Sequence, residues 1–357
     1  MPKLSKKIST NLKNLISAPK NLIFRTLGAP IKPRWLWFGV TNKCNSRCVF
    51  CDIWREKLMK EVLTPNEIEK ALSDPLFRNV EYILNSGGEP TLRQDLKEVI
   101  LAEHKALPNA RIQLSTNALL PERVIDVVKF AVQHDINIDV GTSIDGIGEK
   151  HDQIRGVKGN FEKVDWLLRQ LLILHEEYGD KISATFGFTL IDRTISSLQE
   201  VRAYAKSLNI EFLVQWYNQS SFYNNTENSL AINNESMAKA VMDALPCSLF
   251  REMWLRSLKG KSIKFPCFAM NTFCVLKCNG DIVPCLTKWD STAGNVRQAS
   301  PTEIWRSNQA KQVRGVVKRC EGCLNSWGAG WSFQSCYYQL LSYYLRHPKI
   351  LSKKLIS

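Results

Sequence analysis

The chain has 357 residues, of which 44% are hydrophobic and 23% are charged, a composition that is ordinary for a globular protein with a sizeable core. Its formal net charge of +14 comes mostly from the two ends: residues 1–34 hold eight Lys or Arg, residues 324–357 hold four, and neither stretch holds an acid. Because the middle is close to neutral, the charge distribution argues against an extended phosphate-binding track, and nucleic-acid binding is not favoured.

The sequence also argues against secretion and membrane crossing. No run is apolar enough for a spanning helix, and the first residues lack the apolar block and cleavage site of a secretory signal. Eleven cysteines without such a signal suit metal ligation in a reducing compartment better than a disulfide framework. We therefore expect a cytoplasmic protein.

Residues 1–34 form a basic amphipathic segment. Aliphatic residues recur at helical spacing and lysines fall on the other side of the helix: Leu4, Ile8, Leu12, Leu15 and Ile16 against Lys3, Lys6, Lys7 and Lys13. Such a helix can lie in a membrane interface, or it can dock on its own domain. Residues 326–357 form a second aromatic and basic tail. Two such tails lead to the hypothesis of peripheral contact with the inner face of the cell membrane.

From Trp35 onward, short β-branched or aromatic runs alternate with helical patterns. The expected strands are Leu36–Val40, Val80–Asn85, Arg111–Ser115, Asn137–Ser143, Ile182–Leu190 and Glu211–Trp216. Helices are expected to begin near Thr64, which forms a capping box with Glu67, and near Leu92, Pro121, Asn160 and Ile195. This alternation predicts an α/β fold, a partial (β/α)6 TIM-type barrel over residues 35–245, with its site at the carboxyl ends of the strands. Residues 246–325 are rich in turns and cysteines and are expected to form a small C-terminal domain.

The stretch Thr41–Trp54 holds Cys44, Cys48 and Cys51 in a C-x3-C-x2-C spacing. Three thiolates do not close a tetrahedral structural zinc site, which takes four ligands. They can hold three irons of a [4Fe–4S] cube and leave the fourth iron open to a ligand from solution. The alternative is a zinc site that a distant residue completes.

With Phe50 before its last cysteine, CNSRCVFC resembles the cluster motif of the radical S-adenosylmethionine (SAM) superfamily. The resemblance implies a [4Fe–4S] cluster on Cys44, Cys48 and Cys51, whose open iron is chelated by the methionyl amino and carboxylate groups of SAM. It also implies reductive cleavage of SAM to a 5′-deoxyadenosyl radical that abstracts a hydrogen atom from the substrate. Reduced ferredoxin or flavodoxin is the electron donor that this chemistry implies.

Two strand ends carry further matches to this superfamily. Gly87, Gly88 and Glu89 resemble its GGE motif, which contacts the methionyl amino group, and the glycines let the backbone approach closely. Asn117 stands in Thr116-Asn117-Ala118, where relatives often have Thr-Asn-Gly, so Ala118 leaves the tightness of that turn open.

The fourth strand ends in a region that also resembles the superfamily. Ser143 and Arg155 are candidates for the SAM carboxylate, and Asp145 is expected near the site. For Arg155 an ordinary surface ion pair is the alternative.

The later cysteines resemble SPASM and twitch domains, which bind auxiliary iron–sulfur clusters. A complete SPASM domain has further cysteines where this chain has Ala329 and Phe333, so the shorter twitch pattern matches better. The resemblance implies one auxiliary [4Fe–4S] cluster on four cysteines: Cys267, Cys285, Cys320 and Cys323. A zinc site is the alternative, and three spare cysteines can replace an assumed ligand: Cys274, Cys278 and Cys336.

The resulting hypothesis is a radical SAM oxidoreductase acting on a small, lipid-linked or sugar-linked substrate, with the auxiliary cluster as electron acceptor. Dehydrogenases of a cyclitol alcohol resemble this arrangement. No catalytic residue is assigned, although Asp192, Arg193 and Tyr217 lie near later strand ends. One alternative is a maturase of a ribosomally made peptide. The alternative from another class is a non-catalytic metal-binding or nucleic-acid-binding protein.

Overall fold

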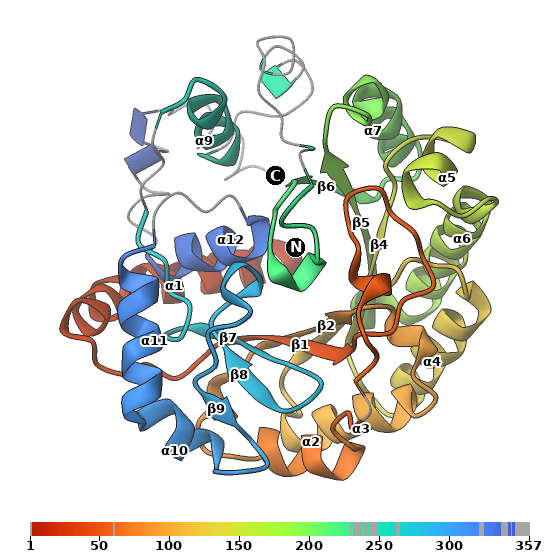
Figure 1. The fold of residues 1–357 in the computed structure, drawn as a ribbon. Helices are drawn as coiled ribbons and strands as arrows, with labels where there is room; N and C mark the ends of the chain where they lie inside the picture. The colour runs from red at the N-terminus through yellow and green to blue at the C-terminus, as the bar shows by residue number, and fades with distance from the viewer. Residues whose placement is uncertain are drawn as a thin grey trace.

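The computed structural model describes residues 2–59, 61–228, 230, 238, 241–242, 249–261, 265–320, 325–336, 342–343 and 345–346, with the backbone alone for residues 2–13 and 15. Six parallel strands form its centre, in the spatial order β6-β5-β4-β3-β2-β1. The strands are β1 Trp35–Thr41, β2 Tyr82–Gly87, β3 Arg111–Ser115, β4 Ile138–Ser143, β5 Ile182–Leu190 and β6 Glu211–Trp216. They curve into an open barrel with helices outside (Figure 1), so the predicted partial α/β barrel is confirmed.

The helices outside the barrel are α2 Pro65–Leu72, α3 Leu96–Ala106, α4 Pro121–Gln133, α5 Glu149–Arg155, α6 Asn160–Tyr178 and α7 Leu198–Ser207. The predicted capping box is confirmed, because Glu67 N donates to Thr64 Oγ1 at 3.3 Å and Thr64 N donates to Glu67 Oε2 at 2.8 Å. The short helix α5 was not among the predicted helices.

Strand β1 shows why both faces of the sheet are buried. Leu36 and Phe38 belong to the main core, which the strands share with the outer helices. Trp35 and Trp37 alternate with them and belong to a second, aromatic cluster on the inner side of the barrel. Because successive side chains of a strand point to opposite faces of the sheet, β1 contributes residues to both clusters.

The cysteine-rich region continues the same sheet. Strand β7, Phe273–Leu276, pairs parallel with β1 at its open edge, and the antiparallel strands β8, Asp281–Val283, and β9, Gly294–Asn295, follow it. The remaining helices are α9 Leu249–Leu258, α10 Pro301–Arg306, α11 Asn308–Lys318 and α12 Ser326–Ser335. The domain boundaries near residues 245 and 325 stay predictions, because residues 243–248 and 321–324 lie outside the described part.

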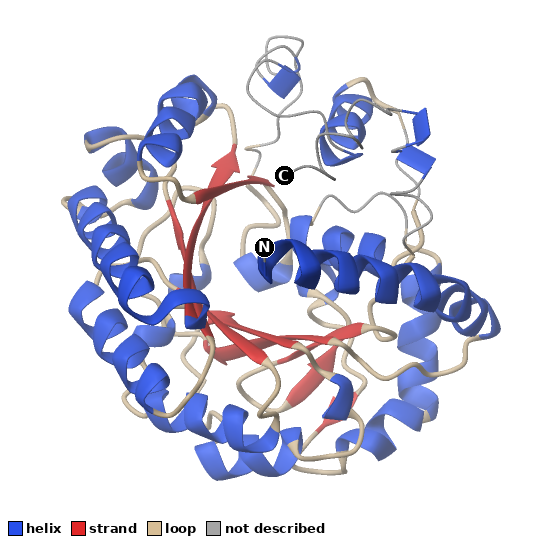
Figure 2. Cartoon of the chain, turned by 180° about the vertical axis from the view of Figure 1, so that it is seen from behind, coloured by secondary structure: helices blue, strands red, loops and turns tan. Residues whose placement is uncertain are grey.

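The N-terminal segment is one helix, α1, Pro2–Leu27. It lies behind α12 in the view of Figure 1 and in front of it in the reverse view of Figure 2. Among the described residues, no helix has the length and apolar character that crossing a lipid bilayer requires.

Candidate active site

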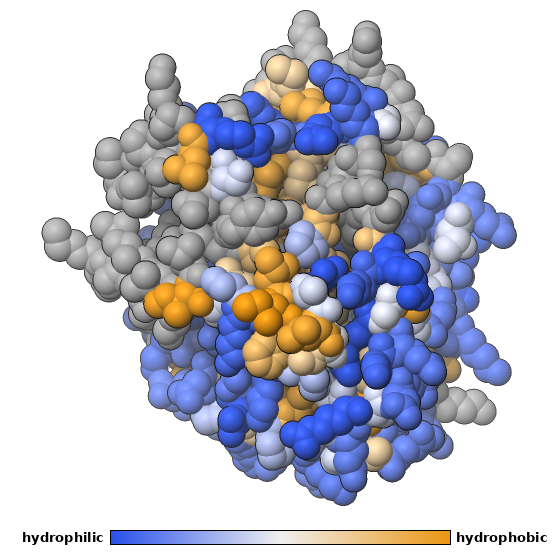
Figure 3. Space-filling view, turned by 90° about the vertical axis from the view of Figure 1, so that its left-hand side faces the viewer, coloured by the Kyte–Doolittle hydropathy of each residue, from blue (hydrophilic) through white to orange (hydrophobic). Residues whose placement is uncertain are grey.

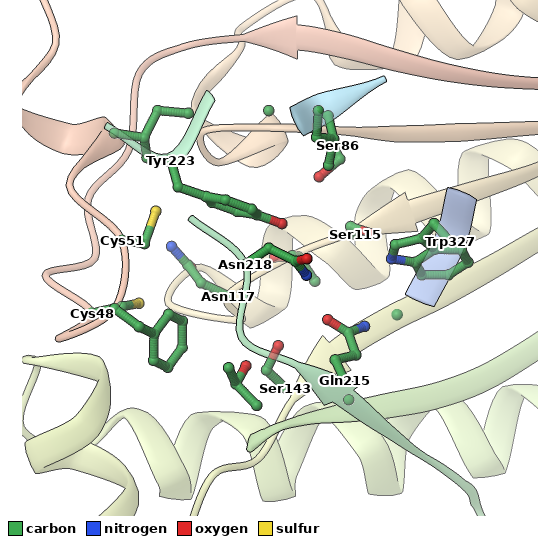
Figure 4. A pocket seen from close by; sticks show the side chains of 18 of the residues that line it. Cys48, Cys51, Ser86, Ser115, Asn117, Ser143, Gln215, Asn218, Tyr223 and Trp327 are labelled. Carbon is green, nitrogen blue, oxygen red and sulfur yellow. The ribbon is translucent and has the colours of Figure 1, made fainter. Parts of the chain in front are cut away.

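Three cysteine thiols line a cavity of about 210 Å³ at the carboxyl ends of the parallel strands. Cys44, Cys48 and Cys51 lie on the loop that follows β1, so the strand leads directly to the site. Figure 4 shows Cys48 and Cys51 on one side of the cavity and Trp327 on the other. The structure therefore brings the trio to the strand ends.

Elements from later in the chain hold this cysteine loop in place. Val49 N donates to Ile154 O at 2.9 Å, at the end of α5. Asn225 Nδ2, from the loop after β6, donates to Phe50 O at 2.8 Å. The cysteine loop is thus held by hydrogen bonds from two later segments of the chain.

Gly87 and Gly88 allow the end of β2 to pack against the backbone of the cysteine loop. Gly88 N donates to Thr41 O at 2.8 Å. A Cβ on Gly88 would lie 2.1 Å from Lys43 O, and one on Gly87 would lie 2.2 Å from Thr41 O. Gly87 also has a φ of 123°, which side chains rarely allow. Both glycines are required for this close approach of two backbones.

Glu89 organises the turn after β3. Its side chain is buried, and it accepts hydrogen bonds from Thr91 N at 3.0 Å, Thr91 Oγ1 at 2.7 Å, Thr116 Oγ1 at 2.9 Å and Asn117 N at 2.6 Å. Burial raises the pKa of Glu89, whereas these hydrogen bonds lower it. The carboxylate therefore joins two strand-end loops.

The turn after β3 is tight even though it lacks glycine. Ala118 is fully buried and adopts a φ of 59°, in the left-handed region. Asn117 Nδ2 donates to Asn45 Oδ1 at 2.8 Å, which ties this turn to the cysteine loop. The tightness that the sequence left open is thus present in the structure.

Asp145 and Arg155 form a buried ion pair beside Cys48. Arg155 Nη2 lies 2.6 Å from Asp145 Oδ2, and Arg155 Nη1 donates to Cys48 Sγ at 3.7 Å. Thr189 N donates a hydrogen bond to the other carboxylate oxygen, Asp145 Oδ1, at 2.6 Å. Burial lowers the pKa of Arg155, but the neighbouring Asp145 and Cys48 raise this pKa by more than burial lowers it. The guanidinium therefore stays charged. Arg155 is only 8% exposed, so the surface ion pair considered as an alternative is wrong.

The donor set of this site fits a cationic metal cluster with an anionic ligand. Burial raises the pKa of Cys44 to about 11 and raises the pKa of Cys51 as well. Bound metal favours the thiolate forms that burial alone disfavours. Arg155 Nε is buried and has no hydrogen-bond partner among the described residues, so it can serve an acceptor that is not part of the chain.

The thiol trio does not have the geometry of a single-metal site. Within the described residues, no three Cys, His, Asp or Glu side chains are close enough to share one metal ion. A zinc ion needs the donor atoms of all its ligands within about 2.3 Å of the metal. Each iron of a [4Fe–4S] cube takes its own thiolate, so the cube suits thiols that stand further apart.

Neutral polar groups and aromatic rings form most of the remaining cavity wall. Among the described lining residues, the only Asp, Glu, Lys or Arg are Glu89 and Arg155, and both are bound to neighbouring protein groups. Ser143, the candidate for the SAM carboxylate, lines the cavity, whereas Asp192 and Arg193 are exposed and do not. The neutral polar and aromatic groups include Gln113, Gln215, Asn218, Ser86, Ser115, Ser143, Thr185, Trp37, Trp216, Tyr217, Phe222, Tyr223 and Trp327.

Sequence reasoning missed several of these lining residues. Figure 4 shows Gln215 from β6, Asn218 and Tyr223 from the following loop, and Trp327 from α12 directed into the cavity. For Gln215 a signal existed, because a polar residue at an inner position of a barrel strand is unusual. The loop residues belong to no motif.

Three of the four predicted auxiliary ligands lie in the described part. Cys267 and Cys285 pack against the aromatic cluster that also holds Cys51. Burial raises the pKa of Cys285, and nearby Cys320 raises it further. Cys323 lies outside the described residues.

The spare cysteines occupy three different places. Cys274 lies in the main core, on the helix-facing side of β7. Cys278 Sγ lies 3.2 Å from Met59 Sδ, and burial raises its pKa to about 11. Cys336 packs into the same aromatic cluster as Cys267 and Cys285. Of the three, only Cys336 shares a cluster with predicted auxiliary ligands.

Comparisons with known proteins identify both cysteine regions. The model of the radical SAM superfamily matches residues 39–200, and that of SPASM, an iron–sulfur cluster-binding domain, matches residues 267–324. An Fe-coproporphyrin III synthase of Methanosarcina barkeri is 38% identical over 156 residues, 43% of this chain and 37% of that protein. A GTP 3′,8-cyclase of Aquifex aeolicus is 31% identical over 123 residues, 33% of this chain and 38% of that protein. The chain spans about half or less of the length of the curated relatives it matches.

Solved structures share the fold over most of the chain. SuiB of Streptococcus suis, bound to the precursor peptide SuiA, superposes with a TM-score of 0.62 at 16% identity, covering 85% of this chain and 70% of SuiB. The protein anSMEcpe with bound AdoMet gives a TM-score of 0.57 at 18% identity, covering 81% of this chain and 84% of anSMEcpe. The two matched domains imply a [4Fe–4S] cluster that works with SAM and an auxiliary cluster. The chain therefore carries a domain of the radical SAM superfamily over residues 39–200 and a SPASM-type iron–sulfur cluster-binding domain over residues 267–324.

Proposed function

We propose that this radical SAM enzyme oxidises a neutral, hydroxyl- or amide-rich small molecule, sugar-linked compounds included, after abstracting a hydrogen atom from it. The observation that carries the proposal is the cavity wall. Amides, hydroxyls and aromatic rings surround the space beside the thiol trio, and the two charged side chains of the described wall are already paired. Such a wall recognises a substrate by neutral hydrogen bonds and ring contacts.

In this proposal Cys44, Cys48 and Cys51 hold the SAM-binding [4Fe–4S] cluster. When bound, the cluster and SAM supply a 5′-deoxyadenosyl radical that removes a hydrogen atom from the substrate. Arg155 balances negative charge beside Cys48, with Asp145 fixing its position. The unpartnered Arg155 Nε is the donor best suited to the SAM carboxylate.

The other predicted contacts take supporting roles in the proposal. Ser143 offers a hydroxyl in the cavity beside Arg155. Glu89 and Asn117 fix the loops around the thiols, because all four hydrogen bonds that Glu89 accepts come from Thr91, Thr116 and Asn117. Gly87 and Gly88 keep the strand end against the cysteine loop.

The second cysteine group supports the choice of an oxidation. We assign the auxiliary [4Fe–4S] cluster to four thiols: Cys267, Cys285, Cys320 and Cys323. Trp37 and Phe222, with ring centroids 5.1 Å apart, belong to the aromatic cluster that contains both Cys51 and Cys285. A net oxidation needs an electron acceptor near the substrate, and a fully ligated cluster suits that role.

The wall argues against two highly charged substrate classes. GTP carries a triphosphate, which proteins bind with several Arg or Lys side chains. The described wall offers only Arg155, and Asp145 holds it. A substrate with several carboxylates meets the same obstacle.

Peptide modification is the second candidate. The amides of Gln215 and Asn218 suit peptide groups as well as sugar hydroxyls. SuiB, which has the same fold, was solved with a precursor peptide.

The test is the yield of 5′-deoxyadenosine from anaerobic protein with SAM and dithionite, to which substrates of different classes are added. Reduced ferredoxin or flavodoxin replaces dithionite as the proposed physiological donor. Neutral polyols or sugar conjugates are expected to raise the yield and to lose two hydrogens by mass. A rise with GTP alone contradicts the proposed substrate class, and a rise with peptides alone establishes the second candidate.

A further inference from the structure

Helix α1 docks on the rest of the protein through a small, polar face. Asn14, Ala18 and Asn21 recur every three or four residues and are 1%, 5% and 6% exposed. Asn21 Nδ2 donates to Ser335 O at 3.1 Å, and Arg25 Nε donates to Cys267 O at 2.7 Å. Leu22 packs beside these residues against the aromatic cluster, so the docked face is mostly polar and contains one large aliphatic side chain.

Three aliphatic residues in the second half of α1 face outward. Ile16, Ile23 and Leu27 are 70%, 56% and 76% exposed, and their spacing of seven and four residues places them on one face of the helix. In the sequence, Ile8 and Leu12 precede Ile16 at the same spacing of four. Figure 3 shows hydrophobic residues gathered near the middle of the side of the molecule on which α1 ends. Three large aliphatic side chains that are more than half exposed on one helix face indicate a surface that is covered in use.

The charge around this outer face determines what can cover it. Residues 1–27 carry six Lys or Arg and no acid, and Lys20 is exposed between Ile16 and Ile23. A surface with hydrocarbon beneath a layer of negative charge complements both properties. A second copy of the same face would bring like charges together, which disfavours self-association.

We propose that the outer face of α1 binds the headgroup region of a membrane rich in anionic lipid, with the helix lying in the interface and not crossing it. This gives the N-terminal helix a second role besides its docking on α12. The inference rests on α1 alone, so it holds or fails independently of the substrate proposed above.

The test is co-sedimentation of the full-length protein with vesicles of phosphatidylglycerol and, in parallel, of phosphatidylcholine. The substitution Ile23→Glu removes an outward aliphatic side chain from α1. Ile173→Glu is the matched control, because Ile173 lies on α6 and is 55% exposed, nearly the same as Ile23. Equal thermal unfolding temperatures establish that both variants fold like the wild type.

The wild type and Ile173→Glu are expected to bind phosphatidylglycerol vesicles equally and phosphatidylcholine more weakly, while Ile23→Glu binds about tenfold more weakly. Added salt is expected to weaken binding. Absence of binding to phosphatidylglycerol, or an equal loss in both variants, overturns the proposal. Dimerisation in lipid-free solution that Ile23→Glu abolishes overturns it as well, because the face then pairs two copies.

Discussion

Asp145 and Arg155 show at the residue scale how the site controls charge. Their ion pair is 2.6 Å long and almost completely buried, with side-chain exposures of 10% for Arg155 and 0% for Asp145. Removing one partner of such a pair leaves a buried charge without compensation. The charge beside Cys48 therefore depends on a carboxylate that does not face the substrate.

Asp145→Asn is expected to lower the free energy of unfolding of the apoprotein by about 3–5 kcal/mol. Asp126→Asn is the matched control, because Lys97 Nζ lies 2.6 Å from Asp126 Oδ2 in an exposed pair, and its loss is expected to cost about 0.5 kcal/mol. Urea unfolding measures both values. If the two substitutions lower the free energy of unfolding equally, burial does not make the Asp145–Arg155 ion pair more important for stability than an exposed pair.

Gly88 shows how a motif residue can act through packing. A methyl group at this position would lie 2.1 Å from Lys43 O, a backbone atom that cannot rotate away. We expect Gly88→Ala to destabilise the protein by about 3 kcal/mol through overpacking. Gly159→Ala, where φ is 76° in the left-handed region and no atom lies within 4 Å of the added Cβ, is expected to cost about 1 kcal/mol from backbone strain alone. Equal losses in urea unfolding would show that the contact with the cysteine loop is not what requires Gly88.

At the scale of elements, one buried acid joins α3 to β2. Asn85 Nδ2 donates to Glu103 Oε2 at 2.7 Å, both side chains are fully buried, and neither Asn85 Oδ1 nor Glu103 Oε1 has a partner among the described residues. Burial raises the pKa of Glu103 to about 8. A protonated Glu103 can donate a hydrogen bond, whereas the ionised side chain can only accept.

The raised pKa of Glu103 predicts how stability depends on pH. Its value in the unfolded chain is about 4.3, so the protonated form stabilises the fold fully below about pH 4, and this contribution is lost as pH rises through about 8. Glu103→Gln keeps the shape and has no proton to lose. The variant is therefore expected to gain stability relative to the wild type between pH 5 and pH 8, measured by urea unfolding at each pH. A difference that stays constant over this range contradicts the pKa assigned to Glu103.

Hydrophobic pattern and turn chemistry predicted the barrel elements closely. The expected strands Arg111–Ser115, Ile182–Leu190 and Glu211–Trp216 match β3, β5 and β6 residue for residue, because they are short segments rich in aliphatic, β-branched and aromatic residues between helical patterns. Helix α5 was missed because its seven residues, EKHDQIR, hold one aliphatic residue and show no helical period. The helix buries His151, Ile154 and Arg155, but two of these are polar, so the hydrophobic pattern of the sequence does not indicate a helix there.

At the scale of the whole molecule, long-range contacts were the part that the sequence did not reveal. Strand β7 pairs with β1 at the open edge of the barrel, although more than two hundred residues separate them in the chain. The loop after β6 reaches back to the cysteine loop through Asn225. Motif spacing predicted the thiols and strand-end loops, whereas Tyr223 and Trp327 reach the cavity only through these long-range contacts.

The central claim is that Cys44, Cys48 and Cys51 hold one iron–sulfur cube while a second cysteine group holds another. Iron analysis of anaerobically reconstituted protein tests it most directly. The wild type is expected to bind about eight irons, and the triple variant Cys44→Ser, Cys48→Ser, Cys51→Ser about four. Cys278→Ser, a buried cysteine outside both groups, is expected to keep the wild-type content. Zinc in place of iron, or an unchanged iron content in the triple variant, contradicts the account.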